Sequence, residues 1–398
     1  MSRCSGKEKG LPPALVTSAH SRVGYTVARQ LAKAGIPVIV GSGSENVMAM
    51  QSRHVCGTFV HPSPFKDEDG FVQCLLDTAD KYSARVLMPI LEETFLVAKA
   101  AGRLRERFAI AMPSYETLLS VHDKYRLGLL SERIGVPTPR LASFEQIAED
   151  HSLLDAFRFP VLVKPRQGGG GWAVNEFATP ASVLEVLDGG RYLDLPLERF
   201  FVQEKIKGSG IGLAMLYGKG TCMASIGYRQ VRTYPVPFGQ PTYRASVHDP
   251  VSERHLRTLL DHLEWDGVCQ ADFLISREDG TPYLIDVNPR YWGSVGHSIA
   301  AGVNIPVMHY RLALGLPCDP VAGFDVDARS RWLGGDIMSF AGSYRLAENK
   351  LAFVKDFLFT RSAYCDDFSF DDPVPFFRWG WDKLRHKGQG DAMEGIWK

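Results

Sequence analysis

Short apolar segments alternate with helical patterns over about the first 120 residues, and this alternation restricts the fold more than any other feature of the sequence. Repeated strand–helix units form a parallel sheet with helices on both faces. We therefore predict a Rossmann-like domain over residues 1–112. The expected strands lie at 14–17, 36–40, 57–60, 85–90 and 108–111, and the helical patterns at 23–34, 70–81 and 94–105.

The pattern changes in the following 200 residues or so. Asp123 can cap a helix over 124–134 that Gly135 ends. From Phe159 onward the expected strands are joined as hairpins by glycine-rich turns, which is typical of an α+β fold. The fold class expected is thus α/β plus α+β: a parallel sheet, then two α+β subdomains at 113–195 and 196–325, then an appendage at 326–398.

Composition excludes several classes of protein. Lys plus Arg and Asp plus Glu both number 45, so there is no net charge to favour nucleic acid or an anionic membrane. No apolar run approaches the roughly 20 residues needed to cross a bilayer, and residues 1–13 lack the apolar stretch of a signal peptide. We expect a soluble, cytoplasmic protein without nucleic-acid or membrane partners.

The first strand–helix turn, residues 17–24, invites comparison with dinucleotide-binding turns. It has only Gly24 where that fingerprint requires three glycines. An acidic residue for the ribose would follow the second strand, but the segment 41–44 reads Gly-Ser-Gly-Ser. A scaffold role is favoured, and an NAD(P)-dependent oxidoreductase stays open as the alternative.

Lys164 ends an apolar strand and is followed closely by four glycines, Gly168 to Gly171. An unpaired ammonium would be costly at the end of an apolar strand, so an anion is expected beside it. A glycine loop lets backbone N–H groups close over phosphates. The alternative is a flexible hairpin tip beside a salt-bridged lysine.

A hairpin centred near residue 279 would set Asp272 opposite Asp286, with Asn288 on the same face. Two opposed carboxylates repel each other unless a cation or a shared proton joins them. Hard oxygen ligands favour Mg²⁺ or Mn²⁺, and Arg290 is placed to clamp a phosphoryl group. The alternative is a solvated hairpin face that holds a water molecule or a lysine.

Together these segments resemble the ATP-grasp superfamily, specifically its ADP-forming carboxylate–amine ligases and the related carbamoyl-phosphate-synthase-like proteins. The resemblance spans roughly residues 12–320. It is carried by the ordered motifs Asp123-Lys124, Val163-Lys164-Pro165, the glycine loop, Val202-Gln203-Glu204, Asp272-Phe273 and Asp286-Val287-Asn288-Pro289-Arg290.

The resemblance implies a Rossmann-like pre-ATP-grasp domain followed by an ATP-grasp fold of two α+β subdomains. It also assigns roles by position. The nucleotide would be bound at its phosphates by Lys124 and Lys164, under a lid of Gly168, Gly169, Gly170 and Gly171, and at its adenine by a hinge of Glu204, Lys205 and Lys207. The metal ligands would be Asp272, Asp286 and Asn288. Arg290 would bind the γ-phosphate and the acyl-phosphate.

The chain departs from the family pattern at three places. Both metal carboxylates are Asp where Glu is more usual, so their reach is one methylene shorter. Ser209-Gly210-Ile211 follows the hinge where an acidic residue usually contacts the ribose. The lid has four consecutive glycines in place of a mixed Gly/Ser pattern, which predicts a more mobile lid.

The family mechanism uses ATP and Mg²⁺ (or Mn²⁺) to convert a substrate carboxylate to an acyl-phosphate, which an amine then attacks. The expected partners are a small-molecule carboxylate and an amine, with a homodimer possible. Candidates for holding the substrate carboxylate are Arg229, Arg232 and Arg244, which could equally be surface arginines. Besides the oxidoreductase, an ATP-binding module without turnover remains open, because the ribose acid is missing.

Overall fold

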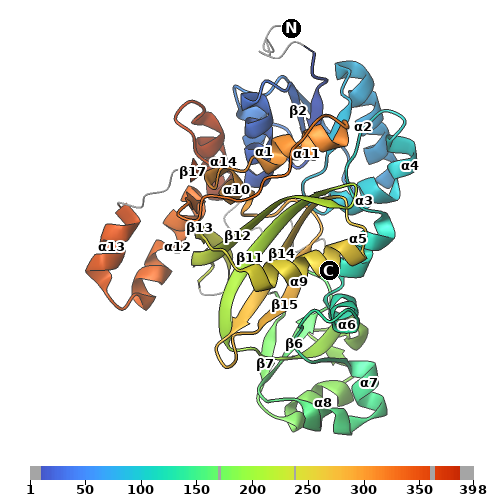
Figure 1. Ribbon diagram of the computed structural model, residues 1–398, viewed down its shortest axis with the longest axis vertical. Coiled ribbons are helices and arrows are strands. Elements are labelled where there is room, and N and C mark those ends of the chain that lie inside the picture. Colours follow the sequence, from blue (N-terminus) through green and yellow to red (C-terminus); the bar gives the residue numbers. More distant parts are fainter. Residues whose placement is uncertain (1–9, 169–171, 237–238, 359–363, 386–398) are drawn as a thin grey trace.

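Four parallel strands near the N-terminus form a sheet in the order β3-β2-β1-β4. The computed structural model of the protein describes residues 10–168, 172–236, 239–358 and 364–385 (Figure 1). Side chains from the two faces of β1 enter different cores, Leu15 one and Val16 the other, so the predicted two-sided burial is confirmed. The elements are β1 (Ala14–Val16), α1 (Arg22–Lys33), β2 (Val38–Ser42), β3 (Gly57–Val60), α2 (Glu68–Tyr82), β4 (Val86–Met88), α3 (Glu93–Lys99) and α4 (Ala101–Leu104).

A small antiparallel sheet follows, in the order β5-β10-β6-β7, and lies at the bottom of Figure 1. Phe144, Val163 and Phe200 belong to its core, and among the described residues this core shares no member with the other two. We call this unit the lid subdomain; it packs around its own apolar centre. Its elements and those leading to it are α5 (Tyr115–His122), α6 (Lys124–Arg133), β5 (Leu141–Ser143), α7 (Phe144–Glu149), β6 (Val161–Pro165), β7 (Asn175–Phe177), α8 (Pro180–Asp188), β8 (Arg191–Tyr192), β9 (Leu195–Pro196) and β10 (Phe200–Glu204).

A large sheet of seven strands, in the order β15-β14-β11-β12-β13-β16-β17, forms the centre of the molecule. Met215 of β11 enters the same core as Leu15, and Leu216 enters the same core as Val16. The N-terminal sheet and the large sheet therefore share both cores and pack as one body. The elements are β11 (Gly208–Gly218), β12 (Thr221–Tyr234), β13 (Gln240–Ser246), α9 (Pro250–His262), β14 (Gly267–Ser276), β15 (Pro282–Asn288), α10 (Val295–Ala300), α11 (Ile305–Ala313) and β16 (Arg329–Arg331).

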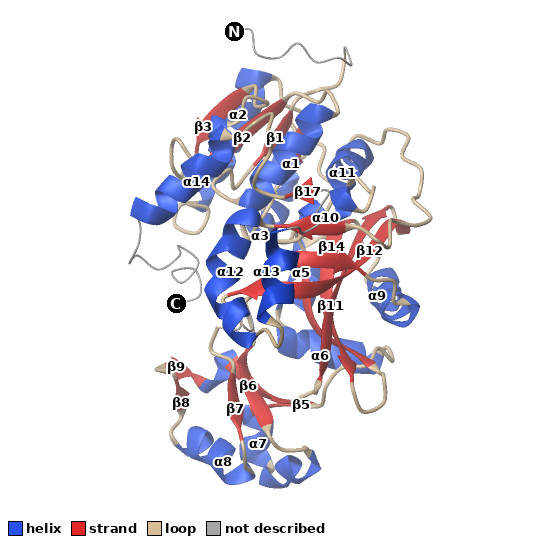
Figure 2. Ribbon diagram, turned by 90° about the vertical axis from the view of Figure 1, so that its left-hand side faces the viewer, coloured by secondary structure: helices blue, strands red, loops and turns tan. Residues whose placement is uncertain are grey.

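The C-terminal segment is tied into this body. Strand β17 (Tyr364–Cys365) pairs in parallel with β16 at the edge of the large sheet. Asp372 accepts hydrogen bonds from the Ser52 hydroxyl (2.5 Å) and the Arg53 amide (3.1 Å) of the N-terminal domain. Figure 2 shows α14 (Val374–Arg385) beside the N-terminal sheet and α12 (Leu333–Leu346) next to α13 (Lys350–Leu358). Within the described ranges, no helix has the length and apolar character needed to cross a membrane.

Candidate active site

The predicted carboxylate hairpin is present with the predicted register. Strands β14 and β15 are antiparallel, and Asp272 lies directly opposite Asp286. Asn288 lies opposite Gln270, whose amide links the two rows of the hairpin. Gln270 Oε1 accepts a hydrogen bond from Asn288 Nδ2 (2.8 Å), and Gln270 Nε2 donates one to Asp272 Oδ1 (2.9 Å). Gln270 therefore fixes the orientation of two of the three predicted metal ligands.

The electrostatics of this pair show that it requires a cation or a proton. Burial, and then the facing Asp286 carboxylate, raise the pKa of Asp272 to about 7. The Gln270 hydrogen bond and the Lys124 charge act in the opposite direction. Lys124 Nζ lies 3.0 Å from Asp286 Oδ1 and supplies one positive charge to the pair.

The donor set fits a hard divalent cation. Two carboxylates and an amide oxygen are the ligand types that Mg²⁺ prefers. In the described ranges, this hairpin included, there is no grouping of three or more His, Cys, Asp or Glu that could hold a metal. Because Asp272 and Asp286 supply only two carboxylates, phosphate oxygens and water would have to complete the coordination of a bound Mg²⁺.

Lys124 connects the hairpin with the glycine loop. Its Nζ donates a hydrogen bond to the Gly168 carbonyl (2.7 Å) while it pairs with Asp286. Lys124 is held in place because it is the first residue of α6. The Asp123 carboxylate caps this helix by accepting hydrogen bonds from the amides of Tyr125 (3.0 Å) and Arg126 (3.1 Å). Lys124 therefore joins the carboxylate hairpin to the start of the glycine loop, and its phosphate-binding role stays a prediction.

Lys164 lies on β6 and is 9% exposed. Its Nζ donates to Gln203 Oε1 (3.0 Å). Burial, and then the nearby Lys124 charge, lower the pKa of Lys164 to about 8, and Asp286 partly offsets this. No carboxylate within the described part of the chain forms an ion pair with Lys164. A buried ammonium without a counter-ion attracts an anion, as its position at the end of an apolar strand predicts.

The strand–loop–strand arrangement predicted for the glycine loop is present, since β6 and β7 are antiparallel neighbours. Gly168 has a φ of +111°, a conformation that strongly favours glycine. The predicted lid residues Gly169, Gly170 and Gly171 lie outside the described residues. The lid assignment remains a prediction for all four glycines.

The expected adenine hinge connects the lid subdomain with the large sheet. Glu204 ends β10, its amide donates to the Arg140 carbonyl (2.8 Å), and its carboxylate lies 4.0 Å from Arg158. Lys205 forms an ion pair with Glu176 of the lid subdomain. The Lys207 carbonyl accepts from the Arg277 amide (2.9 Å) just before β11 begins. This covalent crossing between two separately packed sheets is where a nucleotide base could lie.

Arg290 follows β15 and reaches the N-terminal domain. Its Nη2 lies 2.8 Å from Glu92 Oε1, and its Nη1 donates to the Tyr291 carbonyl (2.9 Å). The side chains of Arg290 and Glu92 are 17% and 7% exposed, so the pair is largely shielded from water. His122 lies within electrostatic reach of Arg290, and burial followed by Lys124 and Arg290 lowers its pKa to about 4. His122 is therefore a neutral imidazole near pH 7.

Polar side chains gather at the carboxyl edge of the N-terminal sheet, where open α/β sheets commonly bind ligands. Glu93 is buried and accepts hydrogen bonds from the hydroxyls of Thr17 and Ser18, the latter at 2.7 Å. These hydroxyls lower the pKa of Glu93, although burial opposes them. His20 remains accessible to solvent, yet loss of hydration among the surrounding protein atoms lowers its pKa, against the opposing effect of Glu93.

The first strand–helix turn is thus filled by contacts within the protein. Its hydroxyls are engaged by Glu93, and a side chain at Gly24 would meet the Ser18 carbonyl at 2.5 Å. These contacts close the helix start against the strand and add no support for a dinucleotide site.

The three arginines predicted to hold a substrate carboxylate differ in their surroundings. Arg232 is paired through Nε (2.8 Å) and Nη2 (2.7 Å) with Asp336 of α12. Arg244 is fully buried, and its Nη1 lies 2.7 Å from Asp366. Arg229 is exposed on β12. Two of the three arginines are therefore paired with carboxylates of the C-terminal segment. The sequence did not predict these ion pairs.

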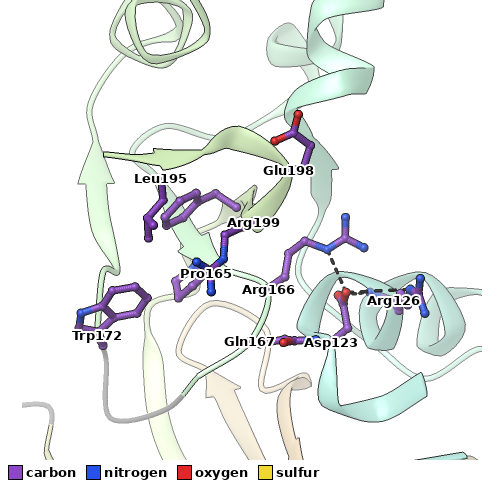
Figure 3. Close-up of a pocket in the computed structure, with 10 residues that line it drawn as sticks. Asp123, Arg126, Pro165, Arg166, Gln167, Trp172, Leu195, Glu198 and Arg199 are labelled. Carbon is purple, nitrogen blue, oxygen red and sulfur yellow. Dashed lines mark hydrogen bonds and ion pairs between the residues drawn. The ribbon is translucent and has the colours of Figure 1, made fainter. Parts of the chain in front are cut away.

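A pocket of about 310 Å³ lies beside the start of the glycine loop (Figure 3). Arg126, Arg166, Arg199 and Trp172 line part of it. The Arg166 Nε donates to Asp123 Oδ2 (2.9 Å), and the Arg166 carbonyl accepts from the Lys124 amide (2.8 Å). The wall of this pocket is thus bonded directly to the segment that positions Lys124.

Sequence reasoning missed Gln270, Glu92, Glu93 and His122. Glu92 and Glu93 follow an apolar strand of the predicted parallel sheet, and residues at the carboxyl end of such a strand commonly line a ligand site. Their position in the sequence could therefore have identified them. His122 directly precedes the Asp123-Lys124 motif. No pattern in the sequence marks Gln270 as different from its neighbours.

No established protein-family profile matches the chain. The chain is 24% identical over 326 residues to the carbamoyl phosphate synthase large chain, N-terminal section, of Methanopyrus kandleri, covering 72% of this chain and 56% of that protein. It is also 24% identical over 221 residues to the carbamoyl phosphate synthase large chain of Methanobrevibacter smithii, covering 52% of this chain and 20% of that protein. The chain therefore spans about half or less of these relatives.

Solved structures share the fold at low identity. The biotin carboxylase domain of Hydrogenobacter thermophilus 2-oxoglutarate carboxylase, a dimer in complex with MgADP and bicarbonate, has a TM-score of 0.63, 15% identity and coverage of 80% of this chain and 73% of that one. The N5-carboxyaminoimidazole ribonucleotide synthetase of Thermus thermophilus has a TM-score of 0.59 and 19% identity, covering 80% and 81%. The L-amino acid ligase of Bacillus licheniformis has a TM-score of 0.58 and 17% identity, covering 77% and 75%.

Proposed function

We propose that this chain, which has the ATP-grasp fold predicted from its sequence, is an ADP-forming ligase that activates a carboxylate as an acyl-phosphate and joins it to an amine. The fold is supported by the solved structures that match about four fifths of the chain. The observation that carries the proposal is the meeting of Lys124 with Asp286 (3.0 Å), which lies opposite Asp272. The buried Lys164 lies within electrostatic reach of Lys124 and Asp286, and Arg290 follows two residues after Asn288. Phosphate-binding cations and metal-binding carboxylates meet there.

In this proposal the nucleotide base lies at the hinge formed by Glu204, Lys205 and Lys207. Lys164 and Lys124 bind the phosphates, and the ion pair of Lys124 with Asp286 orients the phosphate chain toward the hairpin. Asp272, Asp286 and Asn288 would hold Mg²⁺, which supplies charge neutralisation at the transferring phosphoryl group when bound. The Hydrogenobacter thermophilus neighbour was solved in complex with MgADP, which supports a magnesium nucleotide as the ligand.

Arg290 is proposed to act on the developing charge. The substrate carboxylate attacks the γ-phosphate in line, the bond to ADP breaks, and the acyl-phosphate forms. Arg290, largely shielded from water, stabilises the charge on the transferred group more strongly than an exposed arginine would. The glycine loop that begins at Gly168 excludes water from the acyl-phosphate, so that an amine rather than water attacks it.

The test is a phosphate-release screen over L-amino-acid pairs with Mg²⁺ and ATP. We expect release of ADP and phosphate that requires Mg²⁺, a carboxylate and an amine together. Asp286→Asn and Arg290→Ala should each reduce the rate by about 10²–10³, because each removes charge stabilisation at the reacting phosphoryl group. Full activity in either variant would show that the site is assigned wrongly. ATP binding without ADP release across the screen would instead favour a binding module.

A further inference from the structure

The adjacent glutamates at the start of α3 have different environments. Glu93 is satisfied within the protein by Thr17, Ser18 and the Ile90 amide (3.2 Å). Glu92 crosses instead to the large sheet, where its Oε1 meets Arg290 at 2.8 Å. Glu93 is thus a structural brace between two turns, and Glu92 contributes a carboxylate to the reacting end of the site.

Glu92 has unused capacity to accept hydrogen bonds. An ionised carboxylate can accept about four hydrogen bonds. The side chain is 7% exposed, yet within the described part of the chain only Arg290 pairs with it, through Oε1. Among the described residues, no Glu92 atom is both buried and without a partner, so the unpaired Oε2 is in contact with solvent. Its Oε2 is therefore available to a ligand that carries N–H groups and a positive charge.

The position of Glu92 relative to Arg290 indicates which ligand group this is. In the proposed function Arg290 holds the acyl-phosphate, so a group bound to Oε2 lies one ion pair away from the acyl carbon. A carboxylate would be repelled by Glu92, whereas an ammonium would be attracted to it.

We propose that Glu92 binds the attacking amine in its ammonium form and places it beside the acyl-phosphate held by Arg290, an inference that rests on the proposed function. The amine nitrogen loses one proton, its lone pair forms the bond to the acyl carbon, and the C–O bond to phosphate breaks with its electron pair on the leaving oxygen. The amide nitrogen loses a second proton. The balance is acyl-phosphate dianion plus ammonium giving amide, HPO₄²⁻ and one proton. The substrate class is a primary amine that is protonated in solution, such as an amino acid.

The test compares two nucleophiles in one variant. Hydroxylamine is small and uncharged at neutral pH, and it traps an acyl-phosphate as a hydroxamate without needing an ammonium site. Glu92→Gln keeps an oxygen that can accept from Arg290 but removes the charge. With L-amino acids as carboxylates, we expect the KM for an amino-acid amine to rise about tenfold or more, since a charge-assisted contact contributes 1.5–3 kcal/mol. The rate of hydroxamate formation should fall by a much smaller factor.

Matched variants separate binding of the amine from a structural effect. Glu92→Asp keeps the charge on a shorter side chain and should recover part of the loss in amine KM. Glu93→Gln alters the neighbouring brace and should lower both reactions by a similar factor. An unchanged amine KM in Glu92→Gln, or an equal loss in both reactions, would overturn the proposal. If the unaltered protein forms ADP with no hydroxamate and no amide, the proposed function itself is wrong and this inference falls with it.

Discussion

The opposed carboxylates Asp272 and Asp286 should make the ligand-free protein less stable as the pH rises. A folded-state pKa of about 7 for Asp272, against an unperturbed value of 3.8, means that the folded chain binds a proton more tightly than the unfolded chain. The contribution of Asp272 to stability is therefore greatest below about pH 4 and is lost as the pH rises from about 4 to about 7. The full shift corresponds to about 4 kcal/mol. Because Asp272 is only partly buried, solvent screening should reduce this to about 1–2 kcal/mol.

The perturbation that tests this reasoning is Asp272→Asn, which resembles the protonated carboxyl in shape. At pH 5 the variant should already be slightly the more stable, by less than half of the difference expected at pH 8, because the carboxyl ionises in the unfolded chain above pH 3.8. At pH 8, without Mg²⁺, the variant should be the more stable of the two by about 1–2 kcal/mol. Asp279→Asn is the matched control on the same hairpin. The Ser276 hydroxyl and the Thr281 amide lower the pKa of Asp279, so removing that charge should not stabilise the protein at pH 8.

Adding Mg²⁺ with a non-hydrolysable ATP analogue at pH 8 should make the unaltered protein more stable than Asp272→Asn. The ligands bind the folded state and raise the midpoint of the unaltered protein, whereas Asp272→Asn should gain much less. The reasoning is refuted if the effect of Asp272→Asn on stability is the same at pH 5 and pH 8. It is equally refuted if the variant responds to Mg²⁺ and the analogue as the unaltered protein does.

Three further predictions concern the nucleotide path and the packing. Lys124→Met removes contacts with both Gly168 and Asp286 and should raise the KM for ATP about tenfold or more, measured by ADP release; an unchanged KM would exclude Lys124 from the phosphate site. Asp366→Ala leaves the fully buried Arg244 without its carboxylate and should cost about 3–5 kcal/mol in denaturant unfolding, whereas the exposed Asp371→Ala should cost little; equal midpoints would refute the structural role. NADH added to the protein should show no fluorescence transfer from tryptophan, and tight binding would revive the oxidoreductase alternative.

The order of elements and the register of the metal hairpin could be predicted from the sequence because both depend on local patterns. The alternation of strands and helices indicates the parallel sheet, and a hairpin centred near residue 279 predicts the pair of Asp272 with Asp286. Beside the turn the register differs by one residue, and a shift between Asp272 and Phe273 produces the predicted pair. The buried ammonium of Lys164 was also accessible to this reasoning, since it ends an apolar strand.

Contacts between distant segments could not be predicted in this way. Arg290 meets Glu92 across 198 residues, from position 92 to position 290, and no periodicity relates the two positions. The pairing of Arg232 with Asp336 and of Arg244 with Asp366 likewise depends on how the C-terminal segment folds back onto the large sheet. The sequence predicts only an appendage over residues 326–398, whereas Asp336 and Asp366 of that segment pair with buried arginines of the large sheet.

The central claim is that a carboxylate is activated by phosphorylation between Arg290 and the hairpin of Asp272 and Asp286. The most direct measurement uses a substrate carboxylate labelled with ¹⁸O and follows the label by mass spectrometry after turnover with Mg²⁺ and ATP. An acyl-phosphate route transfers one labelled oxygen from the carboxylate to each released phosphate. We predict that result, with ADP as the other product. Phosphate without the label, or label found in AMP, would contradict the account.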